Sequence, residues 1–182
     1  GGGGMMLHHA QEAARAVVAQ LDPLCRRIEV AGSVRRQAPE VRDLEIVCIP
    51  EVASYLEFQR LVDSWPKVRG QSTGRYTRRK LLRHNLELDL FICSAQTWAC
   101  NLTIRTGCAE FSRGLVTLAR AYGLQFRDAQ LWSGARSTGV REEQEIFPLL
   151  GLPWIPPTER TPETARRLPE MAAASTLREV TP

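Results

Sequence analysis

Four carboxylates in two short apolar stretches are the residues of this sequence whose types and spacing best suit chemistry. Asp43 and Glu45 alternate with apolar residues in "DLEIVCIP". Glu87 and Asp89 do the same in "LELDLF". Side chains two apart on a β-strand point to the same side, so each pair is expected to share one face of a sheet. An ionised carboxylate within an apolar strand is costly to bury unless a cation neutralises it.

Two interpretations of these acid pairs are open from residue type and spacing alone. If the two strands are neighbours, three or four carboxylates meet on one patch, where they either share protons or are neutralised by a divalent ion. Oxygen ligands of this kind suit Mg²⁺, which keeps waters and substrate phosphates as its other ligands. The simpler interpretation is that acids alternate with apolar residues because one face of the sheet meets water.

The loop before the first acid pair favours the metal interpretation. Gly32 and Ser33 end the stretch "RIEVAGS", and Arg35 and Arg36 follow directly. Glycine lets a backbone N–H approach a phosphate closely, serine donates a hydrogen bond, and arginine adds charge. Phosphate-binding groups beside metal-binding acids are what phosphoryl or nucleotidyl transfer requires.

The rest of the sequence predicts the elements that would position these groups: an α/β unit followed by a small, mostly helical lobe. Helices are predicted over residues 5–27, 53–65, 95–106, 109–123 and 141–151. Strands are predicted over residues 27–33, 43–50, 75–82 and 86–94, with a hairpin strand in 124–134. Residues 162–182 show little periodicity, so we expect a mobile tail there. The glycines at residues 1–4 are typical of a cloning remnant and are excluded from the predicted fold.

Composition and charge indicate a folded, mildly basic protein with room for one main domain and a small appendage. The 182 residues are 43% hydrophobic and 24% charged, which is enough to build a core. The net charge is +4, and of the 24 basic residues only Lys67 and Lys80 are lysine. This bias fits either a GC-rich genome or bidentate recognition of phosphate, which arginine suits better than lysine.

The segment from Pro66 to Leu86 carries seven basic residues and no acid. It is either a solvated basic face or a nucleic-acid contact. As a contact it would bind phosphates through arginine, with an affinity that is sensitive to salt and independent of base sequence, and its tyrosine could stack on a base. The residues predicted to make this contact are Arg75, Tyr76, Arg78, Arg79 and Lys80.

The five cysteines show neither CxxC spacing nor a neighbouring histidine cluster, which excludes a typical zinc site. Cys48 and Cys93 fall within apolar runs and are expected in the core. An odd number of cysteines without a secretory signal favours a reducing cytoplasm. No apolar run approaches the length of a transmembrane helix, so no membrane partner is expected.

Several motifs resemble those of the family X DNA polymerases, within the wider polymerase-beta-like nucleotidyltransferase superfamily. "GSVRR" followed by "RDLEIV" is similar to the family's Gly-Ser loop and two-carboxylate strand, and "LELDLFI" to the strand with the third carboxylate. "RTGCAEFSRGLVTLARAYG" resembles the family's Thr-Gly turn and following helix. "EEQEIFPLLGLPWIPPTER" resembles its C-terminal signature, so the resemblance extends from Leu7 to Arg160.

The resemblance implies an α+β fold. Residues 5–105 would form a polymerase-beta-like nucleotidyltransferase palm, a mixed sheet with flanking helices. Residues 106–161 would form a small C-terminal lobe that contacts nucleotide and DNA. Because only one helix is predicted before the first strand, the chain resembles a minimal form that lacks the N-terminal lyase module, and lyase activity is not expected.

The resemblance also implies two divalent ions, Mg²⁺ or Mn²⁺, bound by Asp43, Glu45 and Asp89, with a dNTP or NTP as substrate. Asp89, beside the nearer ion, would help to activate the primer 3′-hydroxyl, while Ser33 and Arg36 would hold the β- and γ-phosphates. The residues implied to bind nucleotide are Gly32, Ser33, Arg36, Arg42, Ile104, Arg105, Thr106, Gly107 and Ser112. The implied partner is a DNA primer-template or gapped DNA, bound by a monomer.

Three departures from the family pattern bear on the expected activity. Glu45 replaces the commoner second aspartate, which is one methylene shorter. Arg42 stands where a glycine usually precedes the first aspartate. Ile104 and Arg105 replace an aromatic pair that, in the family, excludes nucleotides with a ribose 2′-hydroxyl. We therefore expect tolerance of ribonucleotides.

The sequence therefore favours metal-dependent nucleotidyl transfer to a nucleic-acid 3′-hydroxyl by a minimal family X-like DNA polymerase. Gap filling in DNA repair or primer synthesis would suit such a chain. One alternative is a nucleotidyltransferase that modifies a small molecule, a tRNA or a protein, and another is a non-catalytic palm that binds nucleic acid. We expect a cytoplasmic protein of a prokaryote or phage.

Overall fold

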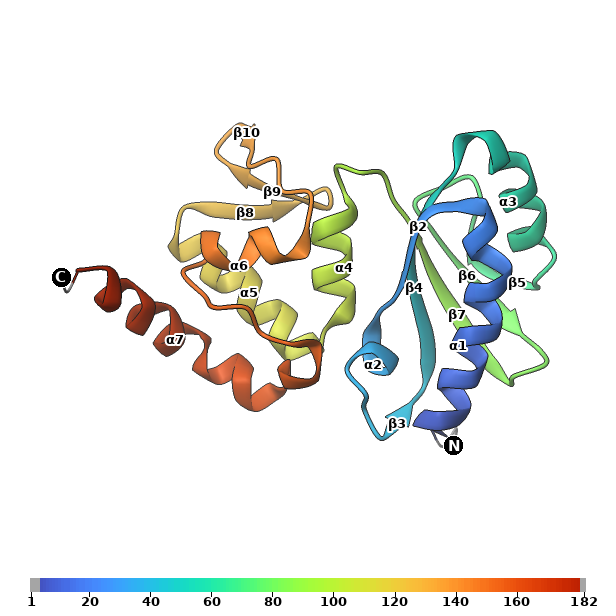
Figure 1. Cartoon of the computed structure of the whole chain (residues 1–182), viewed down its shortest axis with the longest axis horizontal. Coiled ribbons are helices and arrows are strands. Elements are labelled where there is room, and N and C mark those ends of the chain that lie inside the picture. The colour runs from blue at the N-terminus through green and yellow to red at the C-terminus, as the bar shows by residue number, and fades with distance from the viewer. Residues whose placement is uncertain (1–3, 181–182) are drawn as a thin grey trace. The chain divides into compact units, whose positions relative to one another are not determined.

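The computed structural model of the chain describes residues 4–180, which form two compact units (Figure 1). The first unit ends at Ser94. The predicted boundary between residues 105 and 106 falls later than this division, at the end of helix α4 (Trp98–Thr106). Helix α4 belongs to the second unit because its buried face, including Ala99, packs into that unit's core.

The first unit is built on a mixed five-stranded sheet. In order across the sheet, its strands are β2 (Cys25–Val30), β4 (Asp43–Pro50), β7 (Leu86–Ile92), β6 (Tyr76–Leu81) and β5 (Lys67–Gly70). β4 and β7 run parallel, and the other neighbours antiparallel. The other elements are β1 (Met5–Met6), α1 (Leu7–Leu21), α2 (Gly32–Arg35), β3 (Glu40–Val41) and α3 (Tyr55–Asp63). The α+β class, with a mixed sheet and flanking helices, is confirmed.

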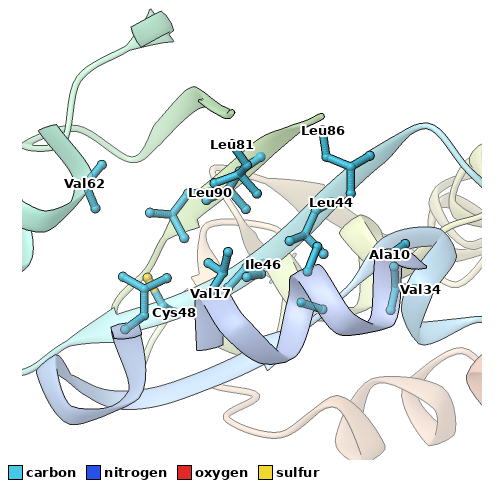
Figure 2. Close-up of a cluster of buried hydrophobic side chains, with 14 of the residues drawn as sticks. Ala10, Val17, Val34, Leu44, Ile46, Cys48, Val62, Leu81, Leu86 and Leu90 are labelled. Carbon is cyan, nitrogen blue, oxygen red and sulfur yellow. The ribbon is translucent and has the colours of Figure 1, made fainter. Parts of the chain in front are cut away.

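Helices α1 and α3 contribute to one core with the apolar side of this sheet (Figure 2). On β4 the buried residues of this core are Leu44, Ile46 and Cys48. The buried side of α1 packs against them in the same cluster. Because side chains alternate along a strand, Asp43 and Glu45 face away from this core. The apolar residues of β4 therefore fix the sheet on its helices and leave the acids on the opposite face.

Most predicted elements of the first unit are confirmed, and the differences are local. β4 has the predicted bounds 43–50. The first helix ends at Leu21 rather than at the predicted residue 27, since Pro23 lacks the N–H that a continued helix needs. β5 has no counterpart in the prediction, because its residues are mostly exposed and carry no clear apolar alternation.

The second unit packs helices with a small three-stranded sheet. After α4 its elements are α5 (Ala109–Ala121), β8 (Leu124–Arg127), β9 (Gln130–Ser133), β10 (Arg136–Ser137), α6 (Ile146–Leu149) and α7 (Pro162–Val180). Phe111, Leu115 and Phe147 are wholly buried in its core. Within residues 4–180, no helix has both the length and the apolar character needed to cross a bilayer.

The expectation of a mobile tail from residue 162 onwards is wrong for the part of it that the structure describes. These residues form helix α7, which packs against α5. Leu168 and Ala172 of α7 are buried in the second core. Gly114 of α5 approaches so closely that an added Cβ would lie 2.8 Å from Leu168 Cδ1. Leu168 and Ala172 are the only buried positions of α7 between residues 162 and 175, which explains the weak periodicity there; residues 181–182 lie outside the described part.

A buried ion pair joins the two ends of the C-terminal signature motif. Arg160 is 0% exposed, and its Nη1 donates to Glu143 Oε2 at 2.7 Å. Its Nε donates to the carbonyl of Ile155 at 2.9 Å. The guanidinium also lies 5.1 Å from the ring centroid of Phe147 and 5.0 Å from that of Trp154. The motif is thus held together through the core of the second unit.

The cysteines differ in burial and in acidity. All five lie within the described residues, and no disulfide joins them. Cys48 and Cys93 are buried, as predicted for core positions. A hydrogen bond with Cys48 lowers the pKa of Cys25, which is half-buried. Burial raises the pKa of Cys100 to about 12. Cys25 therefore has the larger thiolate fraction of these two at neutral pH.

We expect iodoacetamide near pH 7.5 to alkylate Cys25 at least about tenfold faster than Cys100, because the thiolate is the reacting form and Cys100 is buried. A short pulse of reagent, quenching and peptide mass mapping would measure both rates in one sample. Cys25→Ser should remove the fast-reacting site. Equal rates at the two residues would contradict the assignment.

Candidate active site

The parallel pairing of β4 and β7 brings the two acid pairs together on the sheet face opposite the α1 core. In the register of these strands Asp43 lies beside Glu87. Glu45 lies beside Asp89 in the same way. Since residues two apart on a strand share a face, the carboxylates form one patch. The expectation that the two strands are neighbours and that their acids converge is confirmed.

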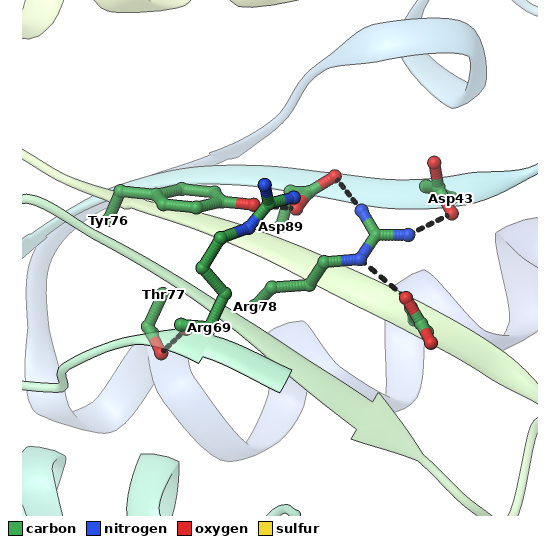
Figure 3. A network of polar contacts seen from close by, with 7 residues as sticks. Asp43, Arg69, Tyr76, Thr77, Arg78 and Asp89 are labelled. Carbon is green, nitrogen blue, oxygen red and sulfur yellow. Dashed lines mark hydrogen bonds and ion pairs between the residues drawn. The ribbon is translucent and has the colours of Figure 1, made fainter. Parts of the chain in front are cut away.

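The guanidinium of Arg78 lies among the carboxylates of this acid patch (Figure 3). Arg78 is on β6, beside Asp89 in the register with β7. It donates from Nη2 to Asp43 Oδ1 at 2.7 Å and from Nη1 to Asp89 Oδ2 at 2.6 Å. Its Nε donates to Glu87 Oε2 at 2.5 Å. One cation therefore contacts three carboxylates that come from two strands.

Charge and hydrogen bonding shift the protonation of groups in the acid patch. Burial lowers the pKa of Arg78, but its hydrogen bonds to the carboxylates raise it by more, so that the net shift is upwards. Tyr76 of β6 donates its hydroxyl to Asp89 Oδ1, and burial and this hydrogen bond raise the pKa of the tyrosine. The guanidinium carbon (Cζ) of Arg69, on β5, lies 5.8 Å from the centroid of the Tyr76 ring. Both Arg78 and Tyr76 thus stay in their protonated forms at neutral pH.

The Gly-Ser loop is fixed to β4 beside Glu45. The Ala31 N–H donates to the carbonyl of Glu45 at 2.8 Å. The next residues form the single turn α2, in which Arg36 N–H donates to the carbonyl of Gly32 at 3.1 Å. Gly32 has a φ of +61°, and a Cβ there would lie 1.7 Å from Glu45 Oε2. Glycine is therefore required both for this backbone conformation and for the position of the Glu45 carboxylate.

A cavity of about 560 Å³ opens beside the acid patch. Asp43 and Glu87 line it, together with two cations, Arg42 and Lys80. Both cations are exposed, so their charge is available to a ligand. A phosphate-bearing molecule in this cavity would meet the acids and these cations together, which suits an anionic substrate that carries its own divalent ion.

Comparisons with known proteins agree on one kind of relative. A family model described as the DNA polymerase beta thumb matches residues 101–161. DNA polymerase lambda of Rattus norvegicus is 32% identical in an alignment of 90 residues, which covers 43% of this chain and 16% of that protein. Polymerase beta of Leishmania infantum, in a ternary P/T complex, matches with a TM-score of 0.70 and 14% identity, over 87% of this chain and 77% of that one. The second unit therefore contains a segment that resembles a DNA polymerase beta thumb, and the chain has the fold of that polymerase beta structure.

The comparisons cover different parts of the chain and show different levels of similarity. The chain spans 16% of the length of the rat polymerase lambda that it matches. The likeness to the Leishmania infantum structure is one of fold, since the identity is 14%. The thumb match falls within the second unit, whereas the acid patch lies in the first. The similarity therefore concerns the fold of the chain and the thumb-like segment of its second unit.

The second-unit residues predicted to bind nucleotide lie around the end of α4. Thr106 is 0% exposed, and its Oγ1 donates at 2.6 Å to a carbonyl one turn earlier in the helix. Ser112 Oγ donates to the carbonyl of Ile104 at 2.8 Å, which ties α5 to α4. Arg105 is exposed, and Gly107 turns the chain with a φ of +67°. Nucleotide binding by these residues stays a prediction.

The structure corrects one predicted nucleic-acid contact. Arg79 is 3% exposed, and its Nε donates to Thr77 Oγ1 at 2.9 Å. Its other nitrogens donate to the carbonyl of Trp65 and to Asp63 Oδ1, each at 3.2 Å. Alternation along β6 turns this side chain to the core side of the sheet, where no phosphate could reach it. Arg75 and Lys80 are exposed, and their contact with nucleic acid stays a prediction.

The donor atoms of the acid patch fit a divalent ion such as Mg²⁺ or Mn²⁺. They are all carboxylate oxygens, which these hard cations prefer. Asp43 and Asp89 already converge on one cation, Arg78. In the part of the chain that the structure describes, no three His, Cys, Asp or Glu side chains surround a common metal position. Asp43, Glu45 and Asp89 are the residues that would hold the ions, and this role stays a prediction.

The sequence predicts Glu87 in the acid patch, because it lies two residues before Asp89 and therefore shares its face. Sequence reasoning missed the ion pairs of Arg78 with Glu87 and the two aspartates. Arg78 gave a misleading signal, because a segment with seven basic residues and no acid indicates a solvated or nucleic-acid-binding surface. The pairing of β6 with β7 decides which way this arginine points, and that pairing is a property of the folded sheet.

Proposed function

We propose that this protein catalyses metal-dependent nucleotidyl transfer to the 3′-hydroxyl of a nucleic acid, as a DNA polymerase. The register of β4 and β7 supports this best, because it gathers carboxylates from both strands on one patch. Divalent ions bound there would activate the attacking hydroxyl and stabilise the pyrophosphate leaving group. The match of residues 101–161 to a DNA polymerase beta thumb and the likeness to a polymerase beta fold agree with this activity.

The positions of the side chains support the roles that the family resemblance implies. Asp43, Glu45 and Asp89 would hold two ions, with Asp89 nearest to the primer 3′-hydroxyl. Ser33 and Arg36 lie on the turn whose backbone is bonded to Glu45, so they would hold the β- and γ-phosphates close to the acids. The exposed Arg42 at the edge of the neighbouring cavity would add a cation for the same substrate.

The nucleic-acid partner that we propose is DNA, as a primer-template or a gapped duplex. The polymerase beta of Leishmania infantum with this fold is described as a ternary P/T complex. Exposed Arg75 and Lys80 would bind the DNA backbone through its phosphates. The chain would act as a monomer and would fill short gaps.

A denaturing-gel extension assay tests this proposal on gapped, recessed and unprimed substrates, with Mg²⁺ or Mn²⁺ and labelled nucleotides. We expect extension of the gapped and recessed substrates that requires divalent ion. Activity without extension of any nucleic acid, such as labelling of a small molecule, a tRNA or a protein, would favour a different nucleotidyltransferase. Binding of DNA without any transfer would favour a non-catalytic palm, since Arg78 already neutralises part of the acid patch.

We expect the enzyme to discriminate weakly between dNTPs and NTPs, by less than about a hundredfold in kcat/KM. Ile104 and Arg105 stand where the family has an aromatic pair beside the ribose 2′-hydroxyl, so a steric barrier is lost there. Single-nucleotide incorporation with each dNTP and its matching NTP measures this ratio. Ile104→Tyr should raise the preference for dNTPs. A strong dNTP preference in the natural chain would contradict the prediction.

We expect Gly32→Ala to lower nucleotide incorporation about a hundredfold, the loss typical of displacing a group that orients a ligand. The new methyl group would overlap Glu45 Oε2 and push this carboxylate off its position. The left-handed φ at residue 32 should also destabilise the alanine variant by about 1–2 kcal/mol. Incorporation rates and urea unfolding of the same preparation separate the two effects.

Gly123→Ala is the matched control for this substitution. Gly123 has a φ of +74°, close to that of Gly32, but no neighbouring atom lies within 4 Å of a Cβ built there. It should show a similar loss of stability and keep its activity. Equal losses of activity in the two variants would mean that backbone strain, rather than displacement of Glu45, explains the effect.

A further inference from the structure

Arg78 supplies the positive charge at the centre of the acid patch. Its guanidinium uses three different nitrogens for the carboxylates of Asp43, Asp89 and Glu87, at 2.7, 2.6 and 2.5 Å. The arginine side chain is 16% exposed, so it stays within the patch rather than in solvent. A cation with this many partners is both held by the acids and holds them in place.

The contacts of Arg78 use carboxylate oxygens that divalent ions would need. Asp89 Oδ2 accepts from the guanidinium, and Asp89 Oδ1 accepts from the hydroxyl of Tyr76. Both oxygens of this carboxylate are therefore engaged within the protein. An ion that binds Asp89 competes with these donors for the lone pairs of the same oxygens. It must also overcome the repulsion of a positive charge a few ångströms away in a partly buried patch.

Glu87 is a partner of Arg78 that is not among the residues predicted to bind metal. It accepts from Nε, whereas the two Nη atoms donate to Asp43 and Asp89. The guanidinium can therefore release both aspartates and remain paired with Glu87. Leaving the arginine without any carboxylate would be unfavourable, because an unpaired charge in a partly buried site is costly.

We propose that Arg78 is a positioning residue that holds Asp43 and Asp89 in the metal-free protein and withdraws to Glu87 when divalent ions bind. Because the guanidinium competes for the same oxygens, it weakens the binding of free ions. Ions that are already bound to a nucleoside triphosphate gain further contacts through its phosphates. They therefore compete better with the guanidinium of Arg78 for the carboxylate oxygens. This inference rests on the proposed function, since it takes the acids to be a metal site.

Calorimetric titration with Mn²⁺ alone, without nucleotide or DNA, tests the competition directly. Arg78→Gln removes the competing charge and keeps polar groups, and it should bind Mn²⁺ about tenfold more tightly than the natural chain. Arg78→Lys keeps the charge but cannot bridge three carboxylates, so its affinity should lie between the two. Arg83→Gln is the matched control, because it removes an exposed arginine outside the patch, and its affinity should stay within about twofold of that of the natural chain.

A second measurement uses the natural chain and does not depend on the folding of a variant. The Nε–Hε resonance of Arg78, identified by its absence in Arg78→Lys, reports on the guanidinium in ¹⁵N-labelled protein. Saturating Mg²⁺ should shift this resonance, because two of the three carboxylate contacts are released. A resonance that does not move at saturating Mg²⁺ would overturn the inference.

The titrations separate this inference from the proposed function. Mn²⁺ binding that Asp43→Asn removes, with no gain of affinity in Arg78→Gln, would overturn the role of Arg78 and leave the metal site standing. An absence of Mn²⁺ binding in both the natural chain and Arg78→Gln would overturn both. Tighter binding by Arg78→Gln, lost again when Asp43→Asn is added, would support both.

Discussion

Replacing Asp89 by asparagine is expected to lower nucleotide incorporation about a thousandfold or more, and Asp43→Asn should do the same. Asparagine keeps the size of the side chain but lacks the negative charge that would bind a divalent ion. Both residues lie in the acid patch, where each accepts a hydrogen bond from Arg78. Single-turnover incorporation on a gapped duplex, with far-UV circular dichroism to check the fold, measures the effect.

Asp128→Asn is the matched control for this pair of variants. Asp128 is exposed in the second unit, and its φ of +50° is a conformation that asparagine readily adopts. This variant should keep the activity of the natural chain. Full activity in both Asp43→Asn and Asp89→Asn would show that the acid patch does not carry the chemistry, and the polymerase proposal would lose its main support.

Arg160→Met should destabilise the second unit by about 3–5 kcal/mol, because it leaves the Glu143 carboxylate buried without its cation. The two side chains are 0% and 2% exposed. The substitution also removes the hydrogen bond to the Ile155 carbonyl and the packing of the guanidinium on the ring of Trp154. Urea unfolding, followed by tryptophan fluorescence, gives the change in the free energy of unfolding.

Two further variants show whether the buried charge is the cause. Adding Glu143→Leu to Arg160→Met should restore much of the lost stability, because no unpaired charge then remains in the core. Arg166→Met breaks the ion pair between Arg166 and Glu163, two side chains that are 71% and 73% exposed. It should lower the free energy of unfolding by less than about 0.5 kcal/mol. A similar effect of Arg160→Met and Arg166→Met would refute the structural role of the buried pair.

The first unit could be predicted well where the pattern of single strands decides the structure. β4 was predictable because its apolar residues alternate with Asp43 and Glu45 and because Pro50 ends the run. Which strands pair with each other was harder to predict from the sequence. The parallel pairing of β4 with β7 joins segments some forty residues apart, and residue patterns only allow it. That pairing decides whether the acids meet, so the site needed the fold as well as the motif.

The misassigned residues share one physical cause, which is burial that composition does not reveal. Arg79 is charged, so residue type alone indicates exposure, yet it is buried with carboxylate and carbonyl partners. Helix α7 was missed for a related reason, because Leu168 and Ala172 are its only buried positions between residues 162 and 175. Each of these arrangements is stabilised by a partner elsewhere in the chain. A local sequence pattern does not identify that partner, so it does not predict the burial.

The alternation along β4 also limits how the gene for this protein can change in length. Inserting or deleting one codon within β4 would exchange the two faces of the strand beyond that point. Asp43 or Glu45 would then enter the apolar core, or core residues such as Ile46 would face solvent. A codon gained or lost in the loop between α2 and β3 would leave both faces as they are. Length variation among related genes should therefore occur in that loop and be absent from the strand.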